Sequence, residues 1–370
     1  MKRWKALCKS KLCWWLVVNL VLIAVFEIAK TNRTLMNFFT QEISTPVGKA
    51  IGSVSYLFPS SVMETLYVTA AGVGMIVLAR FVVDLVSKPQ RLKRLLCGFL
   101  VVCNLGLSIY AGFCGLWGVQ YYGDGFSELS GLEPVGGTTE ELAYVMYYFV
   151  WQLHQTYDQV ERDENGLFAV SQEEILADAP YVYDWVESQY PFLEHDDAVP
   201  RSMAFSQTMS EMNFTGVYSP FTGEAHLNVA SPSCLLPATI AHELGHLRGI
   251  APEDECNFLG VLASVTSGNP VYEYSGYLSG YIYLSNALYS RNYELWYAIA
   301  SQLPYEVTVD LNDNTDYWSQ YKTTPVATVS QGTYDAFLKN YGQTDGIQSY
   351  GMVVDLLLAY YLPVIYGESA

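Results

Sequence analysis

Hydrophobic and polar residues are distributed differently in the two parts of this chain. Three long apolar stretches lie in the first 120 residues, at about 13–30, 62–86 and 95–117. Each is long enough to cross the roughly 30 Å hydrocarbon core of a bilayer as a helix. The first follows a basic segment, as a secretory signal does, but its apolar run is longer and no small-x-small cleavage site follows it. The pattern therefore predicts three uncleaved transmembrane helices.

Beyond residue 120 the pattern becomes that of a folded domain. Apolar residues recur at spacings of three and four over residues 138–160, which predicts an amphipathic helix. Ser171 and Glu174 have the spacing of a capping box that opens a second helix, to about residue 189. A short extended run, Glu224–Val229, lies between Gly, Pro and Ser residues and predicts a β-strand. Strand patterns are scarce elsewhere.

A last apolar segment, residues 351–367, is interrupted by Asp355 and Pro363. These interruptions favour a helix docked on the domain over a fourth membrane span. The predicted fold class is mainly α (α+β). It has three N-terminal transmembrane helices in residues 1–120, followed by a helix-rich domain with a small β-sheet in residues 121–370.

Charge divides the chain at the same place. Residues 1–120 contain 13 Lys and Arg against 4 Asp and Glu, whereas residues 121–370 contain 6 against 33, so the net charge of −18 is the sum of +9 and −27. The basic residues cluster before the first span and in the loop between the second and third, at Lys2, Arg3, Lys5, Lys9, Lys11, Lys88, Arg91, Lys93 and Arg94. Because basic loops stay in the cytoplasm, the N-terminus is expected there and the acidic domain outside the cell membrane.

The composition also excludes some functions. An acidic domain without a basic patch repels phosphate backbones, so nucleic acid is not an expected partner. Only Cys234 and Cys256 of the seven cysteines belong to the acidic part, which is too few for a disulfide scaffold and lacks CxxC spacing.

The candidate chemistry lies in the segment TIAHELGHLRGIAPEDECNF, residues 239–258. Pro237 suits the first turn of a helix and Gly249 its C-terminal end, so His242 and His246 lie one turn apart on the same face. Both imidazoles can then bind one metal ion. Glu243 stands beside the first histidine, where a carboxylate can act as general base towards water. Two imidazoles and a carboxylate suit Zn²⁺ better than Mg²⁺ or Ca²⁺.

A catalytic zinc site normally has three protein ligands and one water, so a third ligand is needed. Pro252 is expected to start a second helix that carries Glu253, Asp254 and Glu255. At 100° per residue, Glu255 shares the face of the apolar residues that follow, whereas Glu253 points to the opposite side. Glu255 is therefore the predicted third ligand, with Glu273 and Glu224 as alternatives.

These residues resemble an uncharacterised family of bacterial membrane proteins whose soluble part carries a zincin-type HExxH motif. The matching stretches are YSPFTGEAHLN (218–228), HELGHLRGIAPEDECNF (242–258), YSGYLSG (274–280) and YDAFLKNYGQTDGIQSYG (334–351). The layout is also similar to that of the HExxH metallopeptidases linked to phage-repressor cleavage. The resemblance implies a zincin-like fold, His242, His246 and Glu255 as ligands, and Glu243 as base. Cys256 departs from it, because alanine is expected there.

The favoured hypothesis is a membrane-anchored zinc metallopeptidase that hydrolyses a peptide or protein near the membrane surface. In zincins a strand edge beside the active-site helix receives the peptide backbone, and Glu224–Val229 is the candidate strand. His226 or Tyr274 are candidates to stabilise the oxyanion. The alternative is a non-catalytic sensor or scaffold with a structural metal site. The acids at 253–255 argue against an intramembrane protease.

Overall fold

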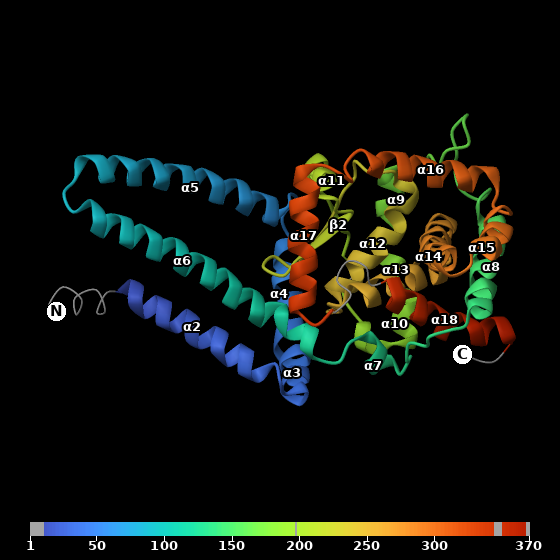
Figure 1. The fold of residues 1–370 in the computed structure, drawn as a ribbon, viewed down its shortest axis with the longest axis horizontal. Helices are drawn as coiled ribbons and strands as arrows, with labels where there is room; N and C mark the ends of the chain where they lie inside the picture. The colour runs from blue at the N-terminus through green and yellow to red at the C-terminus, as the bar shows by residue number, and fades with distance from the viewer. Residues whose placement is uncertain (1–10, 197, 344–349, 368–370) are drawn as a thin grey trace. The chain divides into compact units, whose positions relative to one another are not determined.

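The computed structural model describes residues 11–196, 198–343 and 350–367. The chain forms two compact units (Figure 1). The first, here called the N-terminal unit, consists of Met1–Gly123 and Pro220–Gly223, and the second, the C-terminal unit, consists of Asp124–Ser219 and Glu224–Ala370. Most of the basic segment that precedes the first apolar helix lies outside the described residues.

Three helices of the N-terminal unit are long and apolar enough to cross a membrane: α2 (Lys11–Ala29), α5 (Val62–Ser87) and α6 (Arg91–Leu116). They confirm the three apolar helices expected at 13–30, 62–86 and 95–117. The third begins four residues earlier than predicted, because the helix continues through part of the basic loop. The unit also contains α3 (Arg33–Phe39), η1 (Thr40–Ser44), α4 (Thr45–Ser55) and η2 (Gly118–Tyr122).

A small polar cluster joins α2 and α6 within this apolar unit. The Asn19 side-chain amide donates to the Asn104 carbonyl at 3.2 Å, and Ser108 donates to the Asn19 side chain at 3.1 Å. Trp15 Nε1 donates to the Ser108 hydroxyl at 2.8 Å. Hydrogen bonds of this kind hold helices together where the surroundings are apolar. The pairing of α2 with α6 therefore has polar as well as packing contributions.

The C-terminal unit is mainly helical. Its α-helices are α7 (Phe126–Ser130), α8 (Thr139–Thr156), α9 (Gln172–Asp178), α10 (Asp184–Gln189), α11 (Ser206–Met212), α12 (Leu236–Leu247), α13 (Glu253–Thr266), α14 (Pro270–Arg291), α15 (Tyr293–Ala300), α16 (Tyr305–Ser319), α17 (Pro325–Asn340) and α18 (Tyr350–Tyr366). Short 3₁₀ segments are η3 (Ala179–Tyr181), η4 (Pro191–Leu193) and η5 (Ser233–Leu235). The core lies between α8, α12, α13, α14 and α18, whose inner side chains are fully buried.

Two sequence predictions for these helices hold and one needs correction. The helix predicted from the spacing over 138–160 is α8, and its Thr138 hydroxyl caps the first turn. α18 is docked on the core, since the side chains of Val353, Val354 and Leu356–Leu358 are at most 1% exposed. The helix predicted to run from Ser171 to about 189 is instead divided into α9, η3 and α10. The break coincides with Pro180, which cannot donate a helical hydrogen bond.

A three-stranded sheet completes the C-terminal unit, with β1 (Arg201–Ser202), β2 (Gly216–Ser219) and β3 (Glu224–Leu227). The strand order is β1-β3-β2, with β3 parallel to β1 and antiparallel to β2. The strand expected at Glu224–Val229 is therefore present, but it is the central strand and has no edge to offer a peptide. β2 is an edge strand among the described residues, because its pairing with β3 uses only one of its sides.

Side chains alternate between the two faces of this sheet. Gly216 lies opposite Leu227, and Val217 lies opposite His226, so these two pairs are on opposite faces. The backbone N–H and C=O groups of successive residues also point alternately towards β3 and away from it. The Asn228 N–H donates to the Thr215 carbonyl at 2.9 Å, so the N–H and C=O of Thr215 point towards β3. The N–H and C=O of Gly216 and Tyr218 then point away from β3, towards the edge.

Candidate metal centre

Helix α12 holds the two histidines as the sequence predicted. Pro237 is in its first turn, and Gly249 follows its end with a φ of 92°, a left-handed conformation that glycine adopts without strain. His242 and His246 lie one turn apart, with their ring centroids 4.8 Å apart and the ring planes at 87°. Both rings therefore reach the same point beside the helix.

The turn after Gly249 brings the start of α13 back against these rings. Glu253, the first residue of α13, has one carboxylate oxygen 3.4 Å from His242 Nε2 and the other 3.6 Å from His246 Nε2. Zinc lies about 2.0–2.2 Å from such ligands, so neighbouring ligand atoms in a tetrahedral site are about 3.4 Å apart. The two nitrogen–oxygen separations match this spacing, and the ligand atoms of all three side chains lie within 4.8 Å of one another.

The outer nitrogen of His246 is held by the backbone. Its Nδ1 lies 2.8 Å from the carbonyl of Ile250, which can only accept a hydrogen bond. Nδ1 therefore carries a proton, and Nε2 is the ring nitrogen that faces Glu253 and His242. Metal-binding histidines commonly have this arrangement. The Cys256 thiol donates to the same carbonyl at 3.2 Å and is completely buried, so cysteine fits where the resemblance expected alanine.

Glu243 lies beside the cluster in a confined position. Its side chain is only 3% exposed, and within the described residues its Oε2 has no hydrogen-bond partner. A Cβ atom on Gly216 of β2 would overlap the Glu243 carboxylate, so the absence of a side chain on that strand residue makes room for it. Burial raises the pKa of Glu243 to about 7, against the opposing effect of the two histidines. The carboxylate is therefore suited to exchange protons near neutral pH.

A tyrosine that the sequence analysis did not single out contacts this group. The hydroxyl of Tyr334, on α17, donates to Glu253 Oε1 at 2.5 Å. Burial acts to raise the pKa of Glu253, but the neighbouring histidines and their hydrogen bonds hold it well below its ordinary value. Glu253 is thus held ionised and oriented, as a metal ligand must be. Tyr334 begins one of the stretches that carried the family resemblance, and nothing else in the sequence pointed to it.

The prediction of Glu255 as the third ligand is wrong, because its side chain does not face the histidines. Its side chain is buried, as the helical phase indicated, but it accepts hydrogen bonds from the backbone N–H groups of Phe126, at 2.6 Å, and Ser127, at 3.0 Å. Burial raises the pKa of Glu255, and these two donors partly offset that effect. Glu255 therefore holds the start of α7 against α13, and Glu253 takes the position beside the histidines.

The alternatives considered for the site also lie outside it. Glu224 forms an ion pair with Arg201 at 2.8 Å, and the cluster that could hold a metal does not include Glu273. His226 is on the sheet face opposite Gly216. Tyr274 donates its hydroxyl to Asp310, which is fully buried in α16. Neither is in position to act on a substrate bound at the histidines.

Two exposures show that the cluster can be reached from solvent. The side chains of His242 and Glu253 are 16% and 24% exposed, whereas that of His246 is 6% exposed. Tyr218 of β2 stacks on His246 with a centroid separation of 6.4 Å, which brings the edge strand alongside the rings. Solvent therefore reaches the cluster on the side of His242 and Glu253.

The sequence pattern of a protein family of unknown function, DUF3810, matches residues 39–358 of the chain. No curated protein and no solved structure matches it.

Proposed function

The chain belongs to the DUF3810 family, and from the geometry of its histidine–glutamate cluster we propose that it is a membrane-anchored zinc metallopeptidase. The observation that carries the proposal is the convergence of His242, His246 and Glu253 beside the buried Glu243. The proposed activity is hydrolysis of a peptide bond in a peptide or protein near the membrane surface. The proposed fold of the catalytic part is zincin-like.

The residues present fit a zinc ion. His242, His246 and Glu253 would hold it, with the Ile250 carbonyl orienting one imidazole and the Tyr334 hydroxyl orienting the carboxylate. Two nitrogens and one oxygen are a common ligand set for catalytic zinc, and three protein ligands leave a fourth position open. Bound zinc would lower the pKa of water to about 7 and polarise a carbonyl group.

Glu243 would supply the proton transfers. Its Oε2 is buried without a partner among the described residues, so it is available to accept a proton from the attacking water. The same group can then deliver that proton to the leaving amine. A purely structural metal site has no use for a carboxylate in this position, which is why the enzyme is favoured over a sensor or scaffold.

The edge of β2 would bind the substrate backbone. The N–H and C=O groups of Gly216 and Tyr218 point outwards, next to Glu243 and His246 respectively. An extended peptide that pairs with them would lie across the cluster and gain affinity from main-chain hydrogen bonds. Such binding imposes little sequence preference by itself.

The proposed location is the cell membrane, with the N-terminus in the cytoplasm and the C-terminal unit outside. The three apolar helices support it. So do the basic residues, which lie before the first of these helices and in the loop between the second and the third. Lipid bilayer and a peptide substrate are the expected partners. The strongly acidic composition of the C-terminal part argues against nucleic acid.

The test compares the full-length protein with Glu243→Gln, using Glu173→Gln on exposed α9 as the matched control. Zinc per chain is measured together with digestion of a peptide library. We expect about one zinc in all three proteins, with cleavage lost only in Glu243→Gln. Equal cleavage by Glu243→Gln would overturn the base assignment. Stoichiometric zinc without any cleavage by the native protein would favour a structural metal site.

A further inference from the structure

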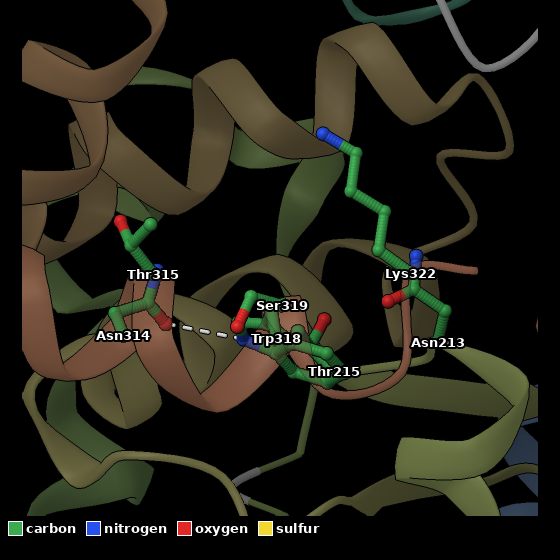
Figure 2. Close-up of a pocket in the computed structure, with 7 residues that line it drawn as sticks. All are labelled: Asn213, Thr215, Asn314, Thr315, Trp318, Ser319 and Lys322. Atoms are coloured by element: carbon green, nitrogen blue, oxygen red, sulfur yellow. Dashed lines mark hydrogen bonds between the residues drawn. The ribbon is translucent and has the colours of Figure 1, made fainter. Parts of the chain in front are cut away.

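A pocket of about 430 Å³ opens next to the start of β2 (Figure 2). One wall comes from the segment between α11 and β2, with Asn213 and Thr215. The other comes from the end of α16 and the residues after it, with Asn314, Trp318, Ser319 and Lys322. The pocket thus lies where the edge strand meets the C-terminal end of α16.

The pocket is close to the candidate metal centre along the strand. Thr215 directly precedes Gly216, the residue that packs against the Glu243 carboxylate. The Thr215 side chain is on the sheet face opposite that of Gly216. One strand residue spans about 3.3 Å and successive side chains point to opposite faces, so a peptide bound along β2 would direct a side chain to the face of Thr215 within one or two residues of the general base. Gln331 of α17 donates to the carbonyls of Met212 and Asn213, at 3.3 and 3.2 Å, and steadies this wall.

The charge of the pocket is opposite to that of its surroundings. Residues 121–370 contain 33 acidic and 6 basic residues, yet no acidic residue lines the pocket and one lysine does. The other five basic residues are engaged, in the pairs Arg162–Asp310, Arg201–Glu224, Arg248–Glu187 and Lys339–Asp335 and in the bond from Arg291 to the Gly137 carbonyl. Lys322 is exposed, and within the described residues no carboxylate pairs with it.

The polar groups around Lys322 add hydrogen-bond donors. Asn314 accepts a hydrogen bond from Trp318 Nε1 at 3.1 Å through its side-chain oxygen, which leaves its amide NH₂ to donate (Figure 2). The two acids nearest in sequence, Asp313 and Asp316, lie on α16 but do not line the pocket. An ammonium group with neutral donors and no lining acid suits a carboxylate better than a cationic group.

We infer that this pocket binds a carboxylate of the peptide substrate, with Lys322 as its charged partner. The inference rests on the proposed peptidase function and specifies its substrate class. A substrate strand antiparallel to β2, the slightly more stable pairing, would place residues C-terminal to the cleaved bond at Thr215. The carboxylate is then an Asp or Glu side chain on that side of the bond, or the C-terminus of the peptide itself.

The first test measures cleavage. A peptide found to be cleaved is remade with Asp, Asn or Lys at each position after the cleaved bond, and with a free or amidated C-terminus. The native protein should cleave the best Asp or free-carboxylate peptide about fivefold faster, in kcat/KM, than its uncharged counterpart, as expected for a partly exposed charge pair. In Lys322→Gln this ratio should fall to about one, and in Lys322→Glu the Lys peptides should become preferred.

Controls separate the two carboxylate sources and exclude general charge effects. Lys339→Gln removes a lysine of the same unit away from the pocket and should keep the native ratio. If only the free C-terminus matters, the pocket recognises chain ends, and if only Asp matters, it recognises side chains. Cleavage with no carboxylate preference, or with a preference that persists in Lys322→Gln, overturns the inference while leaving the peptidase function intact.

A binding measurement tests the pocket in case the native protein cleaves no peptide. Two inactive proteins are compared: the single variant Glu243→Gln and the double variant that also carries Lys322→Gln. The affinity of each is measured for hexa-alanine, for its C-terminal amide, and for amidated peptides that carry one Asp. Lys322-dependent tighter binding of the carboxylate peptides would support the pocket assignment even if the native protein cleaves nothing. Equal binding by both proteins, together with no cleavage, would overturn the pocket assignment and the peptidase function together.

Discussion

The assignment of Glu253 rather than Glu255 to the cluster predicts that their removal has different consequences. Glu253→Ala removes a carboxylate whose two oxygens lie 3.4 and 3.6 Å from the histidine nitrogens. Losing an outer hydrogen-bonding partner of a metal ligand already costs about 10- to 100-fold in metal affinity. Losing a ligand should cost more than about a hundredfold. Glu253→Ala also removes the acceptor of Tyr334 and the carboxylate beside the histidines, but because this side chain is partly exposed, water can take its place, and the metal-free protein should lose less melting temperature than Glu255→Ala.

Glu255→Ala should have the reverse effect. It leaves the buried N–H of Phe126 and the partly buried N–H of Ser127 without their acceptor. An unsatisfied buried donor costs about 1–3 kcal/mol, so a loss of about 3 kcal/mol is expected for the pair. For a unit of this size that corresponds to a fall of roughly 6 to 12 °C in melting temperature. Zinc affinity should change little.

The assay pairs two measurements on detergent-solubilised full-length protein. Zinc per chain is determined after equilibration with a chelator of known affinity, and thermal unfolding is followed on metal-free samples so that binding does not contribute to stability. Glu173→Ala is the exposed control. Zinc loss in Glu255→Ala at an unchanged melting temperature, with zinc retained in Glu253→Ala, would refute the reasoning.

Three further substitutions test neighbouring contacts. Gly216→Ala should displace Glu243 and, since misplacement by about 1 Å can cost a hundredfold, lower turnover by about that factor without loss of zinc. Tyr334→Phe should weaken zinc binding by about 10- to 100-fold in chelator competition, because it releases the carboxylate of Glu253. Asp310→Ala leaves the mostly buried Arg162 side chain, which is 11% exposed, without its carboxylate partner and should cost about 3 kcal/mol in thermal or denaturant unfolding.

Two of these substitutions have a matched control, and all three have a contrary outcome. Gly332→Ala has open space around the added methyl group and should leave turnover unchanged, so an equal loss there would remove the steric explanation. Tyr305→Phe is an exposed control for Tyr334. Native zinc affinity in Tyr334→Phe, or a native melting temperature in Asp310→Ala, would contradict the corresponding contact.

Features that depend on neighbours in sequence could be predicted from the sequence. The three apolar helices follow from uninterrupted runs of side chains, and the pairing of His242 with His246 follows from the helical repeat. Gly249 and Pro252 marked the end of one helix and the start of the next correctly. Burial of Glu255 also followed from its phase on α13. In each case the deciding interactions lie within a few residues of one another.

The tertiary structure decided which groups these elements meet. The turn after Gly249 orients α13 so that its first residue, Glu253, faces the histidines, and helical phase within α13 carries no information about that angle. Glu255 is satisfied by the start of α7, 128 and 129 residues earlier in the chain, and Tyr334 reaches Glu253 across 81 residues.

The sheet and one buried acid are further features that only the tertiary structure decided. The two-residue β1 has no sequence pattern of its own, yet its pairing makes β3 the central strand. Asp310 lies in the acidic segment DLNDNTD, residues 310–316, yet it is buried in α16 with Arg162 as its partner. Local periodicity determines which helices and strands form, because it acts between neighbours. The partner of a buried charge is decided by packing between distant segments, so only the folded structure identifies it.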